Sequence, residues 1–209
     1  MPTLIILTCV VLLPLLLSLW TSFTPFKLTK PDTLYRFVGF RNYERLIGDL
    51  DFWIAFGRTV LFLAIALNLE LVFGLGIALL INKITYGQRT LRTLMMFPMM
   101  FSPILVGFQW KYIFNDNIGL MNNFLREFGV IQPIPWLVDG ILANVSIMAA
   151  EIWSSTSVFA ILLLAGLLGI PKDPIEAAKV DGCNSWQVFK NITLPFLMPF
   201  VFIAMTIRS

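Results

Sequence analysis

Long apolar runs divide this chain, and they constrain its fold more than any other feature. Four of them, residues 2–23, 59–81, 94–114 and 141–168, are at least as long as the stretch of about 20 residues that crosses a bilayer. The first run contains no charge and has no basic residue ahead of it, which distinguishes it from a secretory signal peptide. The runs predict an all-α integral membrane protein with four full spanning helices.

A fifth apolar run begins at Phe196 and has only 12 residues before Arg208. A helix of that length rises about 18 Å, whereas the hydrocarbon core of a bilayer is about 30 Å thick. A helix that ended within lipid would leave its last carbonyls without partners. We therefore expect the chain to stop inside a truncated fifth helix. A re-entrant segment buried in protein is the alternative.

The composition excludes most soluble and catalytic functions. Charged residues make up only 13% of the chain, whereas a soluble domain has about 25%. The chain has no histidine, which excludes His-based triads and His zinc sites, and its two cysteines form no CxxC motif. No GxxxxGK[ST] sequence is present, so ATP would be handled by another subunit. We expect no catalytic residue, metal or cofactor in this chain, and a net charge of +3 gives no reason to expect nucleic-acid binding.

Polar and aromatic residues inside the runs are candidates for a solute pathway. Glu70 and Glu151 are ionisable residues at membrane depth, which is a functional-site hypothesis by default. Trp110 and Trp153 would offer indole faces on which a sugar ring stacks. The alternatives are that the acids serve only packing between helices and that the tryptophans are interfacial anchors.

Prolines and glycines inside the runs predict local geometry rather than binding. Pro98 and Pro103 predict a bend in the third spanning helix. Gly74 and Gly76 predict positions where another helix approaches closely.

Four polar connections separate the runs, at residues 24–58, 82–93, 115–140 and 169–195. An excess of Lys and Arg marks cytoplasmic loops, but here the basic residues are shared almost evenly between the two sides. The density of basic residues slightly favours 82–93 as cytoplasmic.

Residues 169–195 carry signals for two short helices outside the bilayer. Asp173 suits an N-cap, Pro174 suits the first turn, and Glu176 stands where it would complete a capping box. Gly182 would end this helix in a left-handed conformation. Asn184 or Ser185 would cap a second short helix, and Pro195 would mark the turn into the fifth spanning helix. A plain connecting loop is the alternative.

The same segment resembles the EAA loop of the membrane subunits of binding-protein-dependent ABC importers. The matching residues are Glu176-Ala177-Ala178, then Gly182, Ile192 and Leu194-Pro195, all between two membrane spans. The segment Phe37-Val38-Gly39-Phe40-Arg41-Asn42-Tyr43 is similar to the carbohydrate-uptake branch of that family. The resemblance runs from about residue 10 to the end of the chain.

The resemblance implies a type I ABC importer transmembrane domain. Residues 1–209 would form a single domain that is incomplete at its C-terminus, with the sixth helix missing, and an incomplete N-terminus is left open. Residues 169–195 would be the cytoplasmic coupling loop, so that 82–93 is also cytoplasmic while 24–58 and 115–140 face outward. The chain would be part of a multi-pass protein of a bacterial or archaeal plasma (inner) membrane, in contact with lipid.

The resemblance also implies partners and a transport role for a sugar or related polyol. The coupling loop would dock onto a dimer of ATPase subunits, which hold the ATP and Mg²⁺, and Glu176 would pair with a basic residue there. Gly182 would permit the sharp turn beside Asp181. A second, homologous permease subunit would complete the path, and an extracytoplasmic solute-binding protein would deliver the solute.

Two other functions are alternatives to an importer subunit. A secondary transporter or channel would need no ATPase and would have no reason to carry an EAA loop. An intramembrane enzyme is disfavoured because the chain has no histidine and no HExxH sequence.

Overall fold

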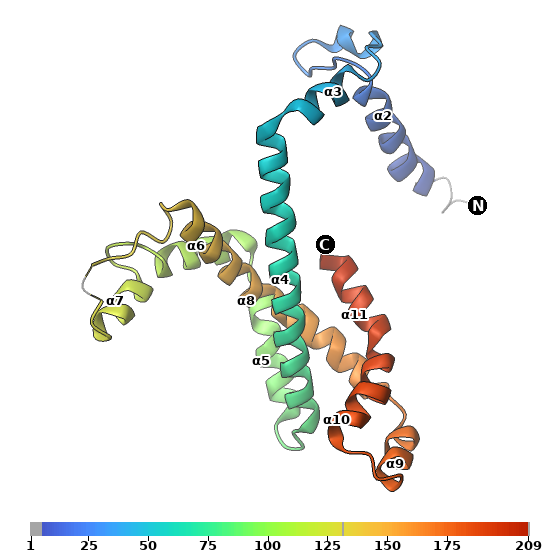
Figure 1. Ribbon diagram of the computed structural model, residues 1–209, viewed down its shortest axis with the longest axis vertical. Coiled ribbons are helices and arrows are strands. Elements are labelled where there is room, and N and C mark those ends of the chain that lie inside the picture. Colours follow the sequence, from blue (N-terminus) through green and yellow to red (C-terminus); the bar gives the residue numbers. More distant parts are fainter. Residues whose placement is uncertain (1–5, 131, 209) are drawn as a thin grey trace. The chain divides into compact units, whose positions relative to one another are not determined.

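The computed structural model describes residues 6–130 and 132–208. The chain divides into an N-terminal unit, Met1–Thr59, and a C-terminal unit, Val60–Ser209, and the boundary falls inside one long helix. Every regular element of the described residues is a helix, and one isolated bridge joins Lys27 and Lys30. The all-α fold is therefore confirmed (Figure 1).

The N-terminal unit is built on one apolar helix and a segment that returns to its end. A π turn, η1 (Thr8–Leu12), continues into α2 (Leu13–Ser22), and η2 (Pro31–Tyr35) and α3 (Arg41–Gly48) follow. Asn42 donates from Nδ2 to the carbonyls of Ser22 and Thr24, at 2.9 and 2.8 Å. These bonds satisfy carbonyls at the end of α2 that have no partner within the helix.

The C-terminal unit contains the long helices. It holds most of α4 (Leu50–Lys83), then α5 (Gln88–Met100), α6 (Pro103–Ile113), α7 (Leu120–Glu127) and α8 (Gly140–Leu168). The remaining elements are α9 (Lys172–Val180), α10 (Ser185–Val188), the π turn η3 (Phe189–Thr193) and α11 (Leu194–Arg208). Within this unit α8 packs against α5 and α11.

Three helices of the described chain are long and apolar enough to cross a membrane, namely 50–83, 140–168 and the continuous helix 185–208. The pair α5 and α6 would form a fourth span if taken together, and it is bent by 89°. The bend lies at Phe101 and Ser102, which both have extended backbone. For Ser102 the cause is Pro103, because the residue before a proline avoids the helical region. The predicted bend in the third run is confirmed. The apolar helix over residues 8–22 is shorter, and residues 2–5 of the first run lie outside the described residues.

The second and third helices begin earlier than predicted. Helix α4 starts at Leu50 instead of Thr59, so the connection predicted at 24–58 contains α3 and the first turns of α4. Helix α5 starts at Gln88, inside the connection predicted at 82–93. In both cases charged residues occupy the first turns of a helix that extends beyond its apolar run. The fourth run, predicted at 141–168, is confirmed as α8.

The predicted start of the fifth helix is wrong. One continuous helix runs from Ser185 to Arg208, 24 residues long, so the expectation of a 12-residue segment too short to cross the bilayer does not hold. Pro195 does not break this helix. The π turn η3 precedes it, and Leu194 N–H donates to the Phe189 carbonyl. The helical hydrogen bonding just before the proline is therefore of the i→i−5 type and not of the i→i−4 type. The same arrangement stands before Pro14, which follows η1.

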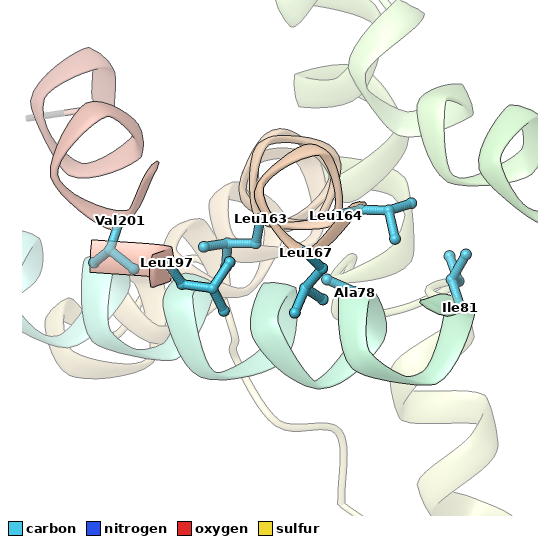
Figure 2. Close-up of a cluster of buried hydrophobic side chains, with 7 residues drawn as sticks. All are labelled: Ala78, Ile81, Leu163, Leu164, Leu167, Leu197 and Val201. Carbon is cyan, nitrogen blue, oxygen red and sulfur yellow. The ribbon is translucent and has the colours of Figure 1, made fainter. Parts of the chain in front are cut away.

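The core of the C-terminal unit joins α4, α8 and α11 (Figure 2). Its buried residues are all aliphatic: Ala78, Ile81, Leu163, Leu164, Leu167, Leu197 and Val201. Glycines bring the helices close, since a Cβ on Gly74 would overlap Phe159 and one on Gly166 would overlap Phe200. Gly76 has no atom that a Cβ would meet, so close packing is confirmed for Gly74 and not for Gly76.

Candidate functional site

Two regions of the C-terminal unit hold the residues that the sequence singles out. One is the EAA segment, which we define as residues 169–195. The other is a cavity between α6 and α8, together with a charged cluster beside it.

The first helix of the EAA segment begins two residues earlier than predicted. Helix α9 starts at Lys172 with Pro171 as N-cap, and the N-cap makes no side-chain hydrogen bond. Asp173 therefore lies in the first turn, where the positive end of the helix dipole stabilises its carboxylate. Pro174 is tolerated there because the first N–H groups of a helix have no internal partner. The predicted capping role of Asp173 is wrong.

The turn after α9 is closed by backbone bonds around Gly182. Gly182 has φ +81°, in the left-handed region that glycine adopts without strain. Gly182 N–H donates to the Lys179 carbonyl at 3.1 Å, and Cys183 N–H donates to the Ala178 carbonyl at 2.9 Å. This pair of bonds is a Schellman motif, and it confirms that Gly182 ends the helix.

A reciprocal cap starts the helix that follows. Asn184 Oδ1 accepts from the Gln187 N–H at 2.9 Å, and the Gln187 side chain accepts from the Asn184 N–H at 2.8 Å. The prediction of a cap at Asn184 or Ser185 is thus confirmed at Asn184. Its partner Gln187 was readable from the sequence as the third residue of a capping box. The helix does not end at Pro195 as predicted but continues as α11.

The signature residues divide into an exposed set and a buried or half-buried set. Glu176, Ala177, Asp181, Gly182 and Pro195 are exposed. By contrast, Ala178 is buried, and Ile192 and Leu194 are half-buried. The short side chain of Ala178 therefore packs within the protein, while the acidic end of the motif remains accessible.

The EAA segment lies against the end of α4. A cavity of about 440 Å³ is lined by Asn82 and Lys83 of α4, by Leu167 of α8 and by Lys179 and Trp186 of the EAA segment. Because these residues share one cavity, the α4–α5 turn and the EAA segment occupy the same end of the C-terminal unit (Figure 1). The segment 115–140 leads into the opposite end of α8, a helix about 43 Å long.

The second region is a cavity of about 540 Å³ between α6 and α8. Trp110, Lys111, Glu151 and Ser154 contribute polar or aromatic groups to its wall. Trp110 meets Trp153 edge to face with ring centroids 5.9 Å apart, and Trp153 lines a neighbouring cavity of about 580 Å³. Three of the four residues predicted for a solute path therefore lie together.

An aromatic row extends from this cavity toward the 115–140 segment. Trp110 stacks on Phe114 with centroids 5.5 Å apart, and Phe114 contacts Trp136 at 5.6 Å. Trp136 in turn donates from Nε1 to Oδ1 of the buried Asn122 at 2.9 Å. Helices α6 and α8 and the segment between them are thus joined by ring contacts along one wall of the cavity.

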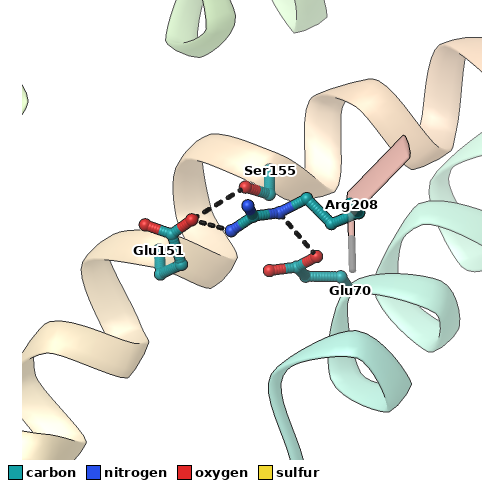
Figure 3. Close-up of polar contacts among 4 residues, drawn as sticks. All are labelled: Glu70, Glu151, Ser155 and Arg208. Atoms are coloured by element: carbon teal, nitrogen blue, oxygen red, sulfur yellow. Dashed lines mark hydrogen bonds and ion pairs between the residues drawn. The ribbon is translucent and has the colours of Figure 1, made fainter. Parts of the chain in front are cut away.

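The fourth predicted residue, Glu70, lies beside the cavity and does not line it. Its side chain is 0% exposed, and its Oε2 lies 3.4 Å from Nε of Arg208. Arg208 also forms an ion pair with Oε1 of Glu151, which accepts from Ser155 Oγ at 3.5 Å (Figure 3). Sequence reasoning did not assign Arg208. The available signal was a cation in the last turn of an apolar helix, in a chain with two acids at membrane depth.

No cluster of three or more His, Cys, Asp or Glu side chains in residues 6–130 and 132–208 has an arrangement that would hold a metal ion. The charged cluster described above contains two carboxylates and one guanidinium. These groups can carry charge and form hydrogen bonds.

Known proteins resemble this chain over its whole length. The trehalose/maltose transport system permease protein MalF of Thermococcus litoralis is 35% identical over 212 residues, which cover 100% of this chain and 70% of that protein. A probable ABC transporter permease protein of Sinorhizobium fredii is also 35% identical, covering 100% of this chain and 67% of its own length. The chain thus spans about two thirds of the length of these relatives.

The fold has a counterpart in a solved structure. A chain of the bacterial alginate ABC transporter, in complex with an alginate pentasaccharide-bound periplasmic protein, aligns with a TM-score of 0.80. The alignment covers 99% of this chain and 68% of that chain, at 22% sequence identity. Residues 70–209, which contain both candidate regions, match the family described as binding-protein-dependent transport system inner membrane component. The chain therefore belongs to this family of ABC importer permeases.

Proposed function

We propose that this chain is the permease subunit that forms the translocation path of an ATP-driven importer for a sugar or related polyol. Membership of the permease family supports the transport role. Relatives that are permeases for trehalose and maltose, and a fold shared with an alginate importer, support a carbohydrate as the solute. An extracytoplasmic binding protein would deliver it, a proposal supported by the complex of the alginate transporter with an alginate pentasaccharide-bound periplasmic protein.

The exposed edge of the EAA segment carries the proposal that an ATPase subunit drives this permease. Glu176 and Asp181 are exposed at the two ends of this edge, while Ala178 is buried between them. Gly182 closes the turn without strain. Exposed carboxylates on a segment that shares a cavity with α4 and α8 suit docking against basic groups of a partner, because movement of the segment would move those helices.

The cavity between α6 and α8 is proposed as part of the solute path. Trp110 offers a broad apolar face, and Glu151 and Ser154 offer acceptors beside it. Sugars combine an apolar ring face with a rim of hydroxyl groups, so a wall of this composition satisfies both parts. Trp153 supports the Trp110 ring, and Glu70 pairs with Arg208, which also pairs with Glu151 of the wall.

The complete importer would contain further subunits. We propose a dimer of ATPase subunits that bind ATP and Mg²⁺, and a second, homologous permease that closes the path on its other side. The assembly would lie in the plasma membrane of a bacterium or archaeon, consistent with a multi-pass inner membrane component. The segments 82–93 and 169–195 would face the cytoplasm, and the segments 24–58 and 115–140 would face outward.

A charge reversal in the full-length permease tests the coupling proposal. Glu176→Lys places a cation on the proposed docking edge, and the matched control is Glu127→Lys on the exposed end of α7. Both are measured in the assembled importer reconstituted with its binding protein. We expect Glu176→Lys to reduce solute-stimulated ATPase activity and trehalose or maltose uptake about tenfold, corresponding to about 1.4 kcal/mol of coupling. Normal uptake by Glu176→Lys, or equal loss in Glu127→Lys, contradicts the proposal.

A further inference from the structure

Arg208 joins two acids that lie on two other helices. It stands in the last turn of α11, with Nε 3.4 Å from Oε2 of Glu70 in α4 and Nη2 paired with Oε1 of Glu151 in α8. Figure 3 shows the guanidinium between the two carboxylates. One side chain therefore fixes the relative positions of three helices of the C-terminal unit.

The two oxygens of Glu151 are used unequally. Oε1 takes both the ion pair with Arg208 and the hydrogen bond from Ser155. Among the residues that the structure describes, no hydrogen bond reaches Oε2, and Figure 3 shows it pointing away from Arg208. The Glu151 side chain is 39% exposed and lines the 540 Å³ cavity. Oε1 is thus held by Arg208 and Ser155, while Oε2 is turned away from both on a partly exposed side chain that lines the cavity.

Glu70 explains why the cation stays in place. It is fully buried, and neither of its oxygens has a hydrogen-bond partner of adequate geometry among the described residues, so its charge is balanced only by Arg208. A buried carboxylate left without a counter-charge is strongly unfavourable, and a guanidinium can contact two carboxylates at once because its donors form a rigid fork. Glu70 therefore determines where Arg208 lies, and Arg208 determines how Glu151 is oriented.

We propose that Arg208 is a positioning residue for solute recognition, which holds Glu151 so that Oε2 accepts hydrogen bonds from the hydroxyls of a neutral sugar or polyol. The assignment of the solute class rests on the proposed function above. Hydrogen bonds to a charged acceptor are the strong ones, so the orientation of this oxygen sets apparent affinity more than turnover. Glu70 serves as the buried anchor of the arrangement.

Uptake kinetics in the full-length, assembled importer test the role. The variants are Arg208→Gln, Arg208→Lys, Glu151→Gln and the double variant Arg208→Gln/Glu151→Gln, with trehalose and maltose as probes. We expect Arg208→Gln to raise the apparent KM about tenfold with little change in the maximal rate, as loss of a hydrogen bond to a charged group predicts. Arg208→Lys should restore most of the affinity, and Arg208→Gln should have almost no further effect once Glu151 is Gln.

A second readout does not depend on transport. Ser154→Cys places a thiol on the cavity wall, in a full-length background in which every native cysteine, Cys9 and Cys183 included, is replaced by alanine. Its rates of reaction with a cationic and an anionic methanethiosulfonate are compared. Arg208→Gln should raise the cationic-to-anionic rate ratio about threefold and Glu151→Gln should lower it, because each changes the charge next to the thiol. Lys111 also lines this cavity but is the same in every variant.

The results separate the two proposals. If the wild-type importer takes up neither disaccharide, the sugar assignment fails while the reagent ratio still decides whether Arg208 controls the charge of the cavity. An unchanged ratio in both variants overturns the inference. A loss of assembly, or a loss of maximal rate at constant KM, shows a purely structural role for Arg208 and overturns the inference. Arg208→Gln having the same effect in the Glu151→Gln background as in the wild type also overturns it.

Discussion

Asn122 accepts a 2.9 Å hydrogen bond from the indole Nε1 of Trp136, and this contact is part of a buried hydrogen-bond network in the segment 115–140. Asn122 is 2% exposed. Its Nδ2 donates to the carbonyls of Asp116 and Ile134, and its Oδ1 also accepts from the Ile134 N–H. One side chain thereby uses its full capacity of two donors and two lone pairs. Asn122, which lies in α7, thereby ties the irregular parts of the segment to this helix.

We predict that Asn122→Ala loosens the segment 115–140. Each buried polar group that it leaves unsatisfied costs about 1–3 kcal/mol. Hydrogen exchange of the purified full-length protein should show faster exchange across this segment, with α8 unaffected beyond its first turns. The control is Asn123→Ala, an exposed neighbour whose side chain makes a longer hydrogen bond, of 3.3 Å, to Ile118. Equal protection in Asn122→Ala and wild type would contradict the role.

The EAA segment was readable from the sequence because its signals are local. Gly182 and Asn184 act through bonds to residues at most five positions away, and such bonds follow from residue type and spacing. The start of the last helix was not readable. Polar residues before Pro195 are typical of a loop, and only the π turn ahead of the proline lets the helix continue. The start of α4 was not readable either, because charged residues occupy its first turns.

The contact of Arg208 with Glu70 and Glu151 could not be derived from the sequence. It depends on how α4, α8 and α11 pack, and these helices are far apart in the chain. The sequence identified both acids and both tryptophans as functional candidates, since each is unusual at membrane depth. It could not show that Glu151 lines the cavity while Glu70 is buried beside it.

We predict that Gly182→Asp uncouples the importer. A non-glycine residue at φ +81° costs about 1–2 kcal/mol, and the new charge stands on the proposed docking edge. The matched control is Gly87→Asp, in the α4–α5 turn, where φ is +76° and a Cβ likewise meets no atom within 4 Å. Both variants should lose similar thermal stability, but only Gly182→Asp should lower solute-stimulated ATPase activity, by about tenfold. Matching losses of activity would show that backbone strain alone is responsible.

We predict that Gly74→Ala destabilises the contact between α4 and α8. A Cβ at this position would overlap Phe159, including its backbone, so one helix must shift. Overpacking of this kind costs about 1–3 kcal/mol. Gly76→Ala, two residues along the same helix, meets open space and should be neutral or stabilising by up to about 1 kcal/mol, the difference in helix propensity. Thermal unfolding of the purified full-length protein in detergent compares the two, and similar melting temperatures would be inconsistent with close packing at Gly74.

We predict that Trp110→Ala weakens solute affinity whereas Trp110→Phe largely preserves it. Trp110 lines the 540 Å³ cavity, and its ring is held between Phe114 and Trp153. Loss of an aromatic platform worth about 1.5 kcal/mol corresponds to a rise of about tenfold in apparent KM for trehalose or maltose uptake. Phe108→Ala is the control, because Phe108 lies on the same helix, is 67% exposed and does not line the cavity. If Phe108→Ala raises KM as much as Trp110→Ala, the effect comes from α6 as a whole and the cavity is not the solute path. An effect confined to Trp110, and reversed by phenylalanine, places the solute against the ring face.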